Sequence, residues 1–490
     1  MRKLFITIIT FVSISVQARQ NVLLEQSFWK TSPDVAAVKA EIEKGSNPSQ
    51  FNGNLFDPVV LAINAGAPNP TIEYLLSQPG NGVDKLTHDG RIYLHWAAMR
   101  GNAELMEFLV GKGAKGNFVD GHGATPINFA AGGGQQNTKV YDICLAHGAD
   151  LKKDLNNDGA NALLIAIAND KDLALTNYFV SKGLDLKSTD AAGNNAFSYA
   201  ARAGKIETLK TLLQKGVPAN SNAILMAAQG SRGGANPIEV YQYLESLKLK
   251  PTVNGKSGEN ALHAIVRKPK QDEIIKYFIS KGVDVNKADE DGNTVFMNAA
   301  ASNRDTAVLG MLLSNIKDIN LGNFKGVSAL AMAVRGNSPE VIGYLIGKGA
   351  DIKTADKNGD NLAFYLVQSY NAQRATEFEG KLKVLQEKGF KVSEPANNGN
   401  TMYHLAAAKN DMSLVKLLEP LKIDVNAKNK EGLTALHRAA MVSKDDAMMK
   451  YLLSVGAKKE IQTSFNETAF DLAGENESLS KNNVIVNFLK

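Results

Sequence analysis

Apolar and polar positions follow a pattern that recurs along nearly the whole chain. In residues 89–114, apolar side chains are spaced by three and four residues, as at Leu105, Phe108 and Leu109. Such spacing is typical of an amphipathic helix that buries one face. Residues 431–457 repeat the same pattern almost position by position, and looser copies lie in and around the gap. The pattern predicts short paired helices, repeated many times.

A turn marked by glycine begins each repeat. Glycine tolerates the positive φ of a tight turn, and so does asparagine, which we expect at this position as Asn466 in the last repeat and as Asn220 in a degenerate one. Most steps between successive glycines are 33 to 36 residues. The glycines are Gly90, Gly123, Gly159, Gly193, Gly258, Gly292, Gly326, Gly359, Gly399 and Gly432.

Two residues after the glycine, most repeats carry a side chain that can cap a helix. Such a side chain accepts a hydrogen bond from a free amide of the first helical turn. Ile92 cannot do this, so we expect a weaker helix start there. The expected caps are Thr125, Asn161, Asn195, Asn260, Thr294, Ser328, Asn361, Thr401, Thr434 and Thr468.

A pair of small residues, such as Ala97 and Ala98, follows in the first helix and lets neighbouring helices approach closely. The second helix ends at a glycine such as Gly113. Leu417 is expected in the core of its repeat. Since one such repeat cannot bury its apolar face alone, neighbouring repeats must stack into a continuous core.

The period, the glycine turn, the capping residue and the Leu-His pairs at Leu94-His95, Leu262-His263 and Leu436-His437 resemble the ankyrin repeat. The resemblance implies an all-α solenoid of about 13–14 units in a curved stack. We assign four parts: a signal peptide at 1–18, an N-terminal capping repeat at 19–51, tandem repeats at 52–465 with a degenerate unit near 220–255, and a C-terminal capping repeat at 466–490.

The first residues resemble a secretory leader. Basic Arg2 and Lys3 precede the apolar run at residues 4–14, and a V-x-A pattern ends at Ala18. This order predicts a signal peptide cut near Ala18, with delivery to a bacterial periplasm or beyond. An N-terminal anchor or a fortuitous apolar start is the alternative. No later run approaches about 18 unbroken apolar residues, so we expect no membrane insertion after cleavage.

The net charge and the cysteine count limit the class of partner that we expect. A net charge of +5 over 490 residues is small and does not indicate a nucleic-acid partner. The single cysteine, Cys144, falls in an apolar slot of a second helix and allows no intrachain disulfide. We expect a monomer that binds an unknown protein or peptide.

Reactive groups are scattered rather than clustered. His88 and His122 lie in adjacent turns near acidic residues, yet their spacing does not favour a metal site over solvated turn residues. Four histidines occupy the Leu-His position, where we expect them to hydrogen-bond the turn backbone. We therefore predict no catalytic residue, cofactor or metal. The four are His95, His263, His404 and His437.

An insertion near 368–381 lengthens one repeat by about seven residues. Insertions in repeat proteins map to loops that often hold a partner, but a long surface loop also costs little, so drift is the alternative. An enzyme site in this insertion is a remote third possibility, because Tyr370, Arg374, Glu377 and Glu379 include no histidine or cysteine.

The resemblance also implies a binding face made by the turn tips and the inner side of the first helices. Phe118 and Phe324 are the expected aromatic anchors, unless each tucks under its own turn. Basic residues just past the small pair, together with Lys409, suggest a ladder for an acidic partner, with a solvated face as the alternative. The predicted binding residues are Phe118, His122, Glu290, Phe324, Lys325, Lys357 and Lys430 at the tips, and Arg100, Arg202, Arg267 and Arg335 on the helices.

We therefore expect an exported scaffold for protein–protein interaction. A secreted effector that acts on host proteins is the alternative function.

Overall fold

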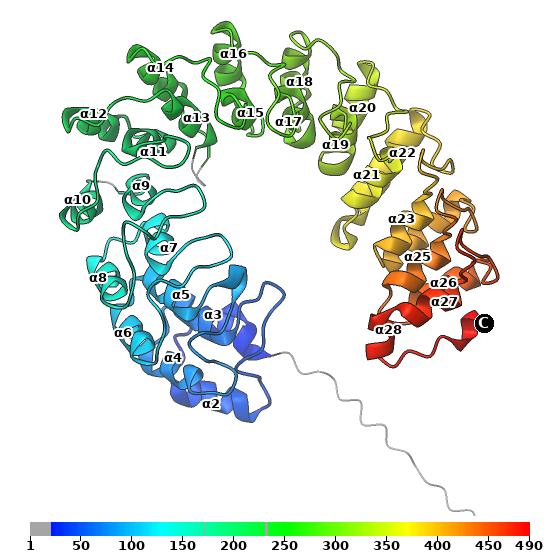
Figure 1. The fold of residues 1–490 in the computed structure, drawn as a ribbon, viewed down its shortest axis with the longest axis horizontal. Helices are drawn as coiled ribbons and strands as arrows, with labels where there is room; N and C mark the ends of the chain where they lie inside the picture. The colour runs from blue at the N-terminus through cyan, green and yellow to red at the C-terminus, as the bar shows by residue number, and fades with distance from the viewer. Residues whose placement is uncertain (1–20, 171, 231–233) are drawn as a thin grey trace, which may run out of the picture. The chain divides into compact units, whose positions relative to one another are not determined.

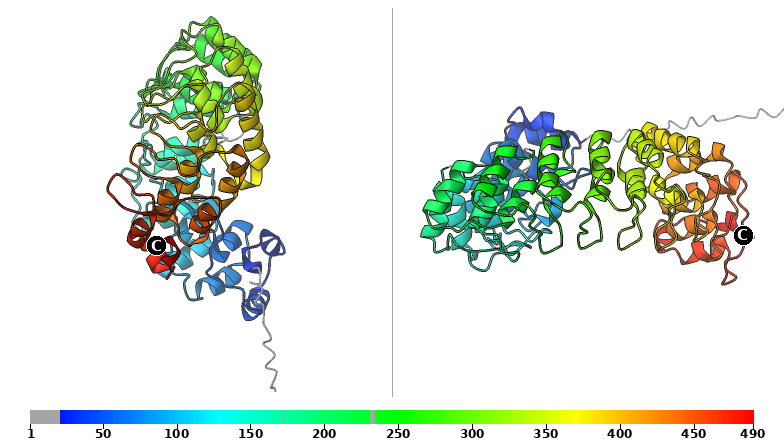
Figure 2. Two further views of the ribbon diagram at one scale, coloured as in Figure 1. Left: turned by 90° about the vertical axis from the view of Figure 1, so that its right-hand side faces the viewer. Right: turned by 90° about the horizontal axis from the view of Figure 1, so that it is seen from above.

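The structure, a computed structural model, describes residues 21–170, 172–230 and 234–490. In these residues the chain forms 28 α-helices and five 3₁₀ turns, with isolated β-bridges in place of a sheet. These helices form 14 successive pairs, one pair for each repeat. Figures 1 and 2 show the paired helices along the chain. The predicted all-α repeat solenoid is confirmed. The signal peptide expected at 1–18 lies outside the described residues.

The chain divides into two units, the first ending at Ala223 and the second beginning at Ile224. Unit 1 holds α1 Gln26–Trp29, α2 Val35–Glu43, α3 Pro58–Ala65, α4 Asn69–Leu76, α5 Tyr93–Arg100, α6 Ala103–Gly111, α7 Pro126–Gly132, α8 Thr138–Ala146, α9 Ala162–Ile167, α10 Ala174–Ser181, α11 Ala196–Arg202 and α12 Ile206–Gln214, with 3₁₀ turns η1 Val22–Leu24 and η2 His88–Gly90. The boundary falls within α13 Asn222–Gln229.

Unit 2 continues the same pairing to the end of the chain. Its 3₁₀ turns are η3 Ala372–Arg374, η4 Glu419–Leu421 and η5 Asn487–Leu489. Its helices are α14 Ile238–Ser246, α15 Ala261–Ile265, α16 Asp272–Ser280, α17 Val295–Ser302, α18 Thr306–Leu313, α19 Ala329–Gly336, α20 Pro339–Gly347, α21 Leu362–Ser369, α22 Ala375–Glu387, α23 Met402–Ala408, α24 Met412–Leu418, α25 Ala435–Val442, α26 Ala447–Ser454, α27 Ala469–Glu475 and α28 Glu477–Lys481.

The turns have the geometry that their sequences predict. All ten turn glycines have positive φ, between 71° and 83°, and Asn466 does too, at 63°. Asn220 is the exception, because it is not among the described residues with positive φ. Its side chain instead accepts a hydrogen bond from the Asn222 N–H (2.8 Å) as α13 begins and donates one to the Gly193 carbonyl (2.7 Å). The prediction that Asn220 replaces the turn glycine is therefore wrong.

The first helices start and pack as predicted. All ten expected caps stand at N-cap positions, and Ile92 is an N-cap that makes no side-chain capping bond. The small pair at Ala97 and Ala98 is buried. Leu417 is a correction, because it is only half-buried, whereas Leu414 and Leu418 of the same helix are fully buried. The buried stripe of α24 follows the i, i+4 pair and leaves Leu417 at its edge.

The insertion is not the surface loop that its sequence suggested. Residues 368–381 include the end of α21, all of η3 and the first seven residues of α22, which at 13 residues is the longest described helix. Apolar residues spaced for a helix continue through the insertion, so the second helix begins earlier in the sequence. Its residue Phe378 is buried. Lys381 is buried as well, and its ammonium donates to the Val334 carbonyl at 3.1 Å. Glu377 lies 3.7 Å from Arg304 and 4.0 Å from Lys381.

Candidate interaction surface

The turn tips of unit 2 are tied to one another through their backbones. The amide of Phe324 donates to the Asp291 carbonyl at 3.0 Å, and that of Lys357 donates to the Lys325 carbonyl at 2.9 Å. The amide of Lys430 donates to the Asn398 carbonyl in the same way, at 3.1 Å. Each of these three tips is thereby held by the previous one, so its side chains project from a fixed backbone.

Phe324 is the exposed aromatic residue that the sequence predicts at these tips. It is 63% exposed, while its backbone and one ring edge lie against Gly292. Lys325 follows it directly, and Lys357 occupies the next tip; both are exposed. Glu290 and Lys430 are exposed as well, on the tips before and beyond this group.

Phe465 is a tip residue that sequence reasoning missed. It is 81% exposed and directly precedes Asn466, the residue that replaces the turn glycine of the last repeat. Its place in the turn register is the signal that could have revealed it, because Lys325 holds the same position in its own repeat.

Unit 1 presents a different, charged pair of tips. Arg91 pairs with Asp89 (2.9 Å) and with Asp120 (2.8 Å) of the next repeat, while His88 and His122 each lie 3.3 Å from the same Asp89 oxygen. Burial opposes ionisation of Asp89, but the hydrogen bond and charge of Arg91, with the two imidazoles, outweigh it and hold the pKa of Asp89 below its usual value. His122 is exposed, as predicted.

Phe118 is not the exposed anchor that its sequence position suggested. It is half-buried, and its ring lies edge-on to His95 with the centroids 6.1 Å apart. Phe118 also lines a cavity between two repeats. The alternative reading, in which the ring tucks under its turn, is closer to the structure.

Exposed aliphatic residues recur on the tips of unit 1, and the sequence reasoning missed these too. Leu86, Val119 and Leu155 are all exposed and each stands four residues before a turn glycine. Leu55 takes the glycine position itself, with φ of 58°. Their recurrence four residues before a turn glycine could have revealed them from the sequence.

The predicted basic residues lie on or just beyond the ends of first helices, and all are exposed: Arg100, Arg202, Arg267 and Arg335. In unit 2, Arg267 donates to the Asn298 side chain at 2.9 Å. Lys409 differs, because its ammonium donates to the Val367 and Tyr370 carbonyls at 3.2 and 2.8 Å and so helps to end α21. Of the predicted basic residues on the first helices of unit 2, Arg267 and Arg335 therefore remain to contact a partner. They lie one on each side of α17.

The four histidines of the Leu-His position bind the backbone, as predicted. His404, for example, accepts from the Thr401 amide at 3.1 Å and contacts the Leu433 carbonyl at 2.8 Å. Burial lowers the pKa of all four, that of His95 to about 4. Cys144 is buried, and burial raises the pKa of its thiol to about 12. These groups are therefore neutral structural elements near pH 7.

In the described part of the chain, no three or more His, Cys, Asp or Glu side chains are grouped so that they could hold a metal ion. In the same residues no helix has the length and apolar content needed to cross a membrane.

Paired short helices, capped turns and backbone-linked tips define a helical-repeat scaffold. The family model for ankyrin repeats in three copies matches residues 59–153, 94–190, 136–223, 224–323, 262–356 and 373–463. The chain belongs to the ankyrin-repeat family. Ankyrin repeats generally mediate interactions between proteins.

Curated relatives share the repeats at low identity. The chain is 27% identical to the nuclear factor NF-kappa-B p105 subunit of Gallus gallus over 210 residues, which is 41% of this chain and 21% of the relative. It is 22% identical to the transient receptor potential cation channel subfamily A member 1 of Homo sapiens over 428 residues, 86% of this chain and 32% of the relative. The match to Rabankyrin-5 of Mus musculus is 25% over 247 residues, 47% and 20% respectively. The chain thus spans a fifth to a third of these relatives.

Proposed function

We propose that the chain is an exported scaffold that binds a partner protein or peptide through its turn tips and first helices, without catalysis. The observation that carries the proposal is the tip group of unit 2, formed by Phe324, Lys325 and Lys357. An aromatic ring that is 63% exposed stands beside two exposed ammonium groups on tips joined by backbone hydrogen bonds. Rigid aromatic anchors beside charged residues are typical of binding hot spots.

The charge of this group favours an acidic partner. Arg267 and Arg335 add two guanidinium groups on first helices of the same unit, and opposite charge on a partner would steer association and fix its orientation. Binding is therefore expected to weaken as salt rises.

Mutation of the tip group tests this function. The triple variant F324A/K325A/K357A should lose the partners that the unaltered protein recovers from its native compartment. The matched control is K276A/K383A/K416A, which removes three exposed lysines from the second helices α16, α22 and α24. Equal recovery by both triples would refute binding at the tips. The variant R202A/R267A/R335A tests the basic residues of the first helices. If it recovers the same partners at low salt, these residues do not contribute to binding.

Export is the second part of the proposal and rests on residues 1–18. Cell fractionation with N-terminal sequencing should find the mature chain in the periplasm or medium, beginning near Arg19. An uncut chain in the cytoplasm would refute export and leave the binding proposal standing. We also propose that the free protein is a monomer, which light scattering coupled to size exclusion checks.

A further inference from the structure

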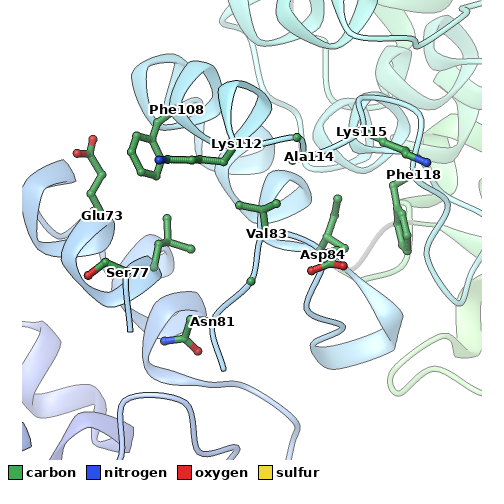
Figure 3. Close-up of a pocket in the computed structure, with 14 residues that line it drawn as sticks. Glu73, Ser77, Asn81, Val83, Asp84, Phe108, Lys112, Ala114, Lys115 and Phe118 are labelled. Carbon is green, nitrogen blue, oxygen red and sulfur yellow. The ribbon is translucent and has the colours of Figure 1, made fainter. Parts of the chain in front are cut away.

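A cavity of about 800 Å³ opens between the second helices α4 and α6 of unit 1. Figure 3 shows Phe108 and Phe118 on opposite sides of Val83, which lies near the middle of the lining. Leu76, Ile92 and Ala114 also belong to the apolar part of the lining. The cavity belongs to the second-helix side of the repeats and so differs from the tip surface described above.

The cavity lies beside the end of α4, which is further from its terminal glycine than the ends of other second helices. Other second helices end two residues before their terminal glycine of positive φ, as α6 does at Gly111 before Gly113. Helix α4 ends at Leu76, four residues before Gly80. Pro79 lies between, and the residue before a proline disfavours the helical conformation. Helix α4 is one residue shorter than α6, and two more residues separate its end from the terminal glycine than in α6.

Ser77 contributes a small, exposed side chain to the cavity just after the end of α4. It lines the cavity and stands three residues before the terminal glycine. Eight other repeats carry an aliphatic residue at that position, and only Gln386 is also polar. The aliphatic residues are Ile42, Val110, Leu145, Val180, Leu213, Ile279, Ile346 and Leu453. Within the helices, however, Leu76 is the eighth residue of α4 as Val110 is of α6, so Leu76 is the counterpart of these aliphatic residues and Ser77 is a small side chain just after the helix.

Charges of both signs surround the apolar lining. Glu73 on α4 and Lys112 just after α6 come from the helices, whereas Asp84 and Lys115 come from the two segments that return to the tips. Lys112 lies over the Phe108 ring, 5.6 Å from its centroid. In the described chain, Glu73, Asp84 and Lys115 are not part of any ion pair. Two carboxylates and two ammonium groups are therefore available to a ligand.

We propose that this cavity binds a short zwitterionic peptide with apolar side chains, about the size of a dipeptide. The apolar lining suits the side chains, the carboxylates suit a free α-ammonium group, and the lysines suit a free α-carboxylate. Cavities of roughly 300–1,000 Å³ hold small organic ligands of this class, and a single amino acid would leave most of the space empty. The proposal is independent of the partner-binding function.

Titration calorimetry of the full chain with leucyl-phenylalanine tests the site. Binding should be measurable, with a Kd between roughly 10 μM and 1 mM. Two controls separate the contribution of the apolar side chains from that of the terminal charges. N-acetyl-leucyl-phenylalaninamide keeps the side chains without the charges, and glycylglycine keeps the charges without the side chains. Both should bind at least about tenfold more weakly. Failure of leucyl-phenylalanine to bind, or equal binding by either control, overturns the proposal.

Filling the gap tests its location. Ser77→Leu adds an isobutyl group to the lining at an exposed position, so it should reduce affinity at least about tenfold without lowering the thermal midpoint. Ser77→Ala keeps the cavity and should bind as the unaltered chain does. The double variant E73Q/D84N retains shape and should weaken leucyl-phenylalanine while leaving the neutral analogue unchanged. Unchanged binding by Ser77→Leu or by E73Q/D84N would place the ligand elsewhere and refute the assignment.

Discussion

Alanine substitutions at two nearby glycines of unit 2 can measure how much the contact between neighbouring tips contributes to stability. Gly282 and Gly292 both have φ of 81°. A Cβ added at Gly282 would have no heavy atom within 4 Å, whereas at Gly292 it would lie 2.6 Å from the Phe324 nitrogen and 2.7 Å from its ring. Gly292→Ala therefore combines backbone strain with a clash against the next tip, and Gly282→Ala carries the strain alone.

The structure gives the size of the difference. An L-residue in the left-handed region costs about 1–2 kcal/mol in either variant. At Gly292 the added methyl group must also displace Phe324, which breaks the bond from its amide to the Asp291 carbonyl. A net hydrogen bond contributes about 0.5–1.5 kcal/mol. We expect Gly292→Ala to destabilise its repeat by about 1 kcal/mol more than Gly282→Ala does.

Amide hydrogen exchange is the suitable assay, because an array of repeats opens locally rather than in one step. Exchange at the Phe324 amide should accelerate about fivefold more in Gly292→Ala than in Gly282→Ala, the factor that matches about 1 kcal/mol. Equal acceleration in both variants would show that the tips do not hold one another. It would also remove the rigid presentation on which the binding surface depends.

Three further predictions concern stability. Leu418→Ala, at a fully buried position, should lower the free energy of unfolding by about 2–5 kcal/mol, and the half-buried Leu417→Ala by clearly less; urea titration of both checks the register. Lys430→Ala, at an exposed tip, should change it by less than about 0.5 kcal/mol in the same titration. The folded-state pKa of His95 is depressed to about 4 from its usual 6.5, so the stability from its neutral form is present above pH 6.5 and is lost as pH falls toward 4; denaturation midpoints at several pH values should show this decline, and a flat profile between pH 6.5 and 5 would contradict it.

The sequence predicts the repeat and its local chemistry well, because those features depend on a few neighbouring residues. A glycine with positive φ, a capping Thr or Asn and a buried alanine pair each act within one turn or helix, and each recurs many times. Asn220 fails for a related reason. Its repeat has lost part of the turn, so the same side chain starts a helix and binds the Gly193 carbonyl instead.

The exposure of individual tip residues could not be predicted in the same way. Phe118 stands five residues before its turn glycine, where its ring meets the buried His95 ring, whereas Phe324 stands two residues before its glycine and lies against Gly292 with its ring exposed. The place of an aromatic residue in the turn therefore matters as much as its presence there. The insertion likewise forms the first part of helix α22, because apolar residues spaced for a helix continue through it.

Site-specific photo-crosslinking in living cells tests the central claim most directly. A photoreactive residue is placed at Lys357 on a tip of unit 2 or, as the matched control, at exposed Lys383 on the second helix α22. The account predicts that one discrete partner is captured from Lys357, that it is absent from Lys383, and that F324A abolishes it. Capture of the same partners with equal yield from both positions would contradict binding at the tips.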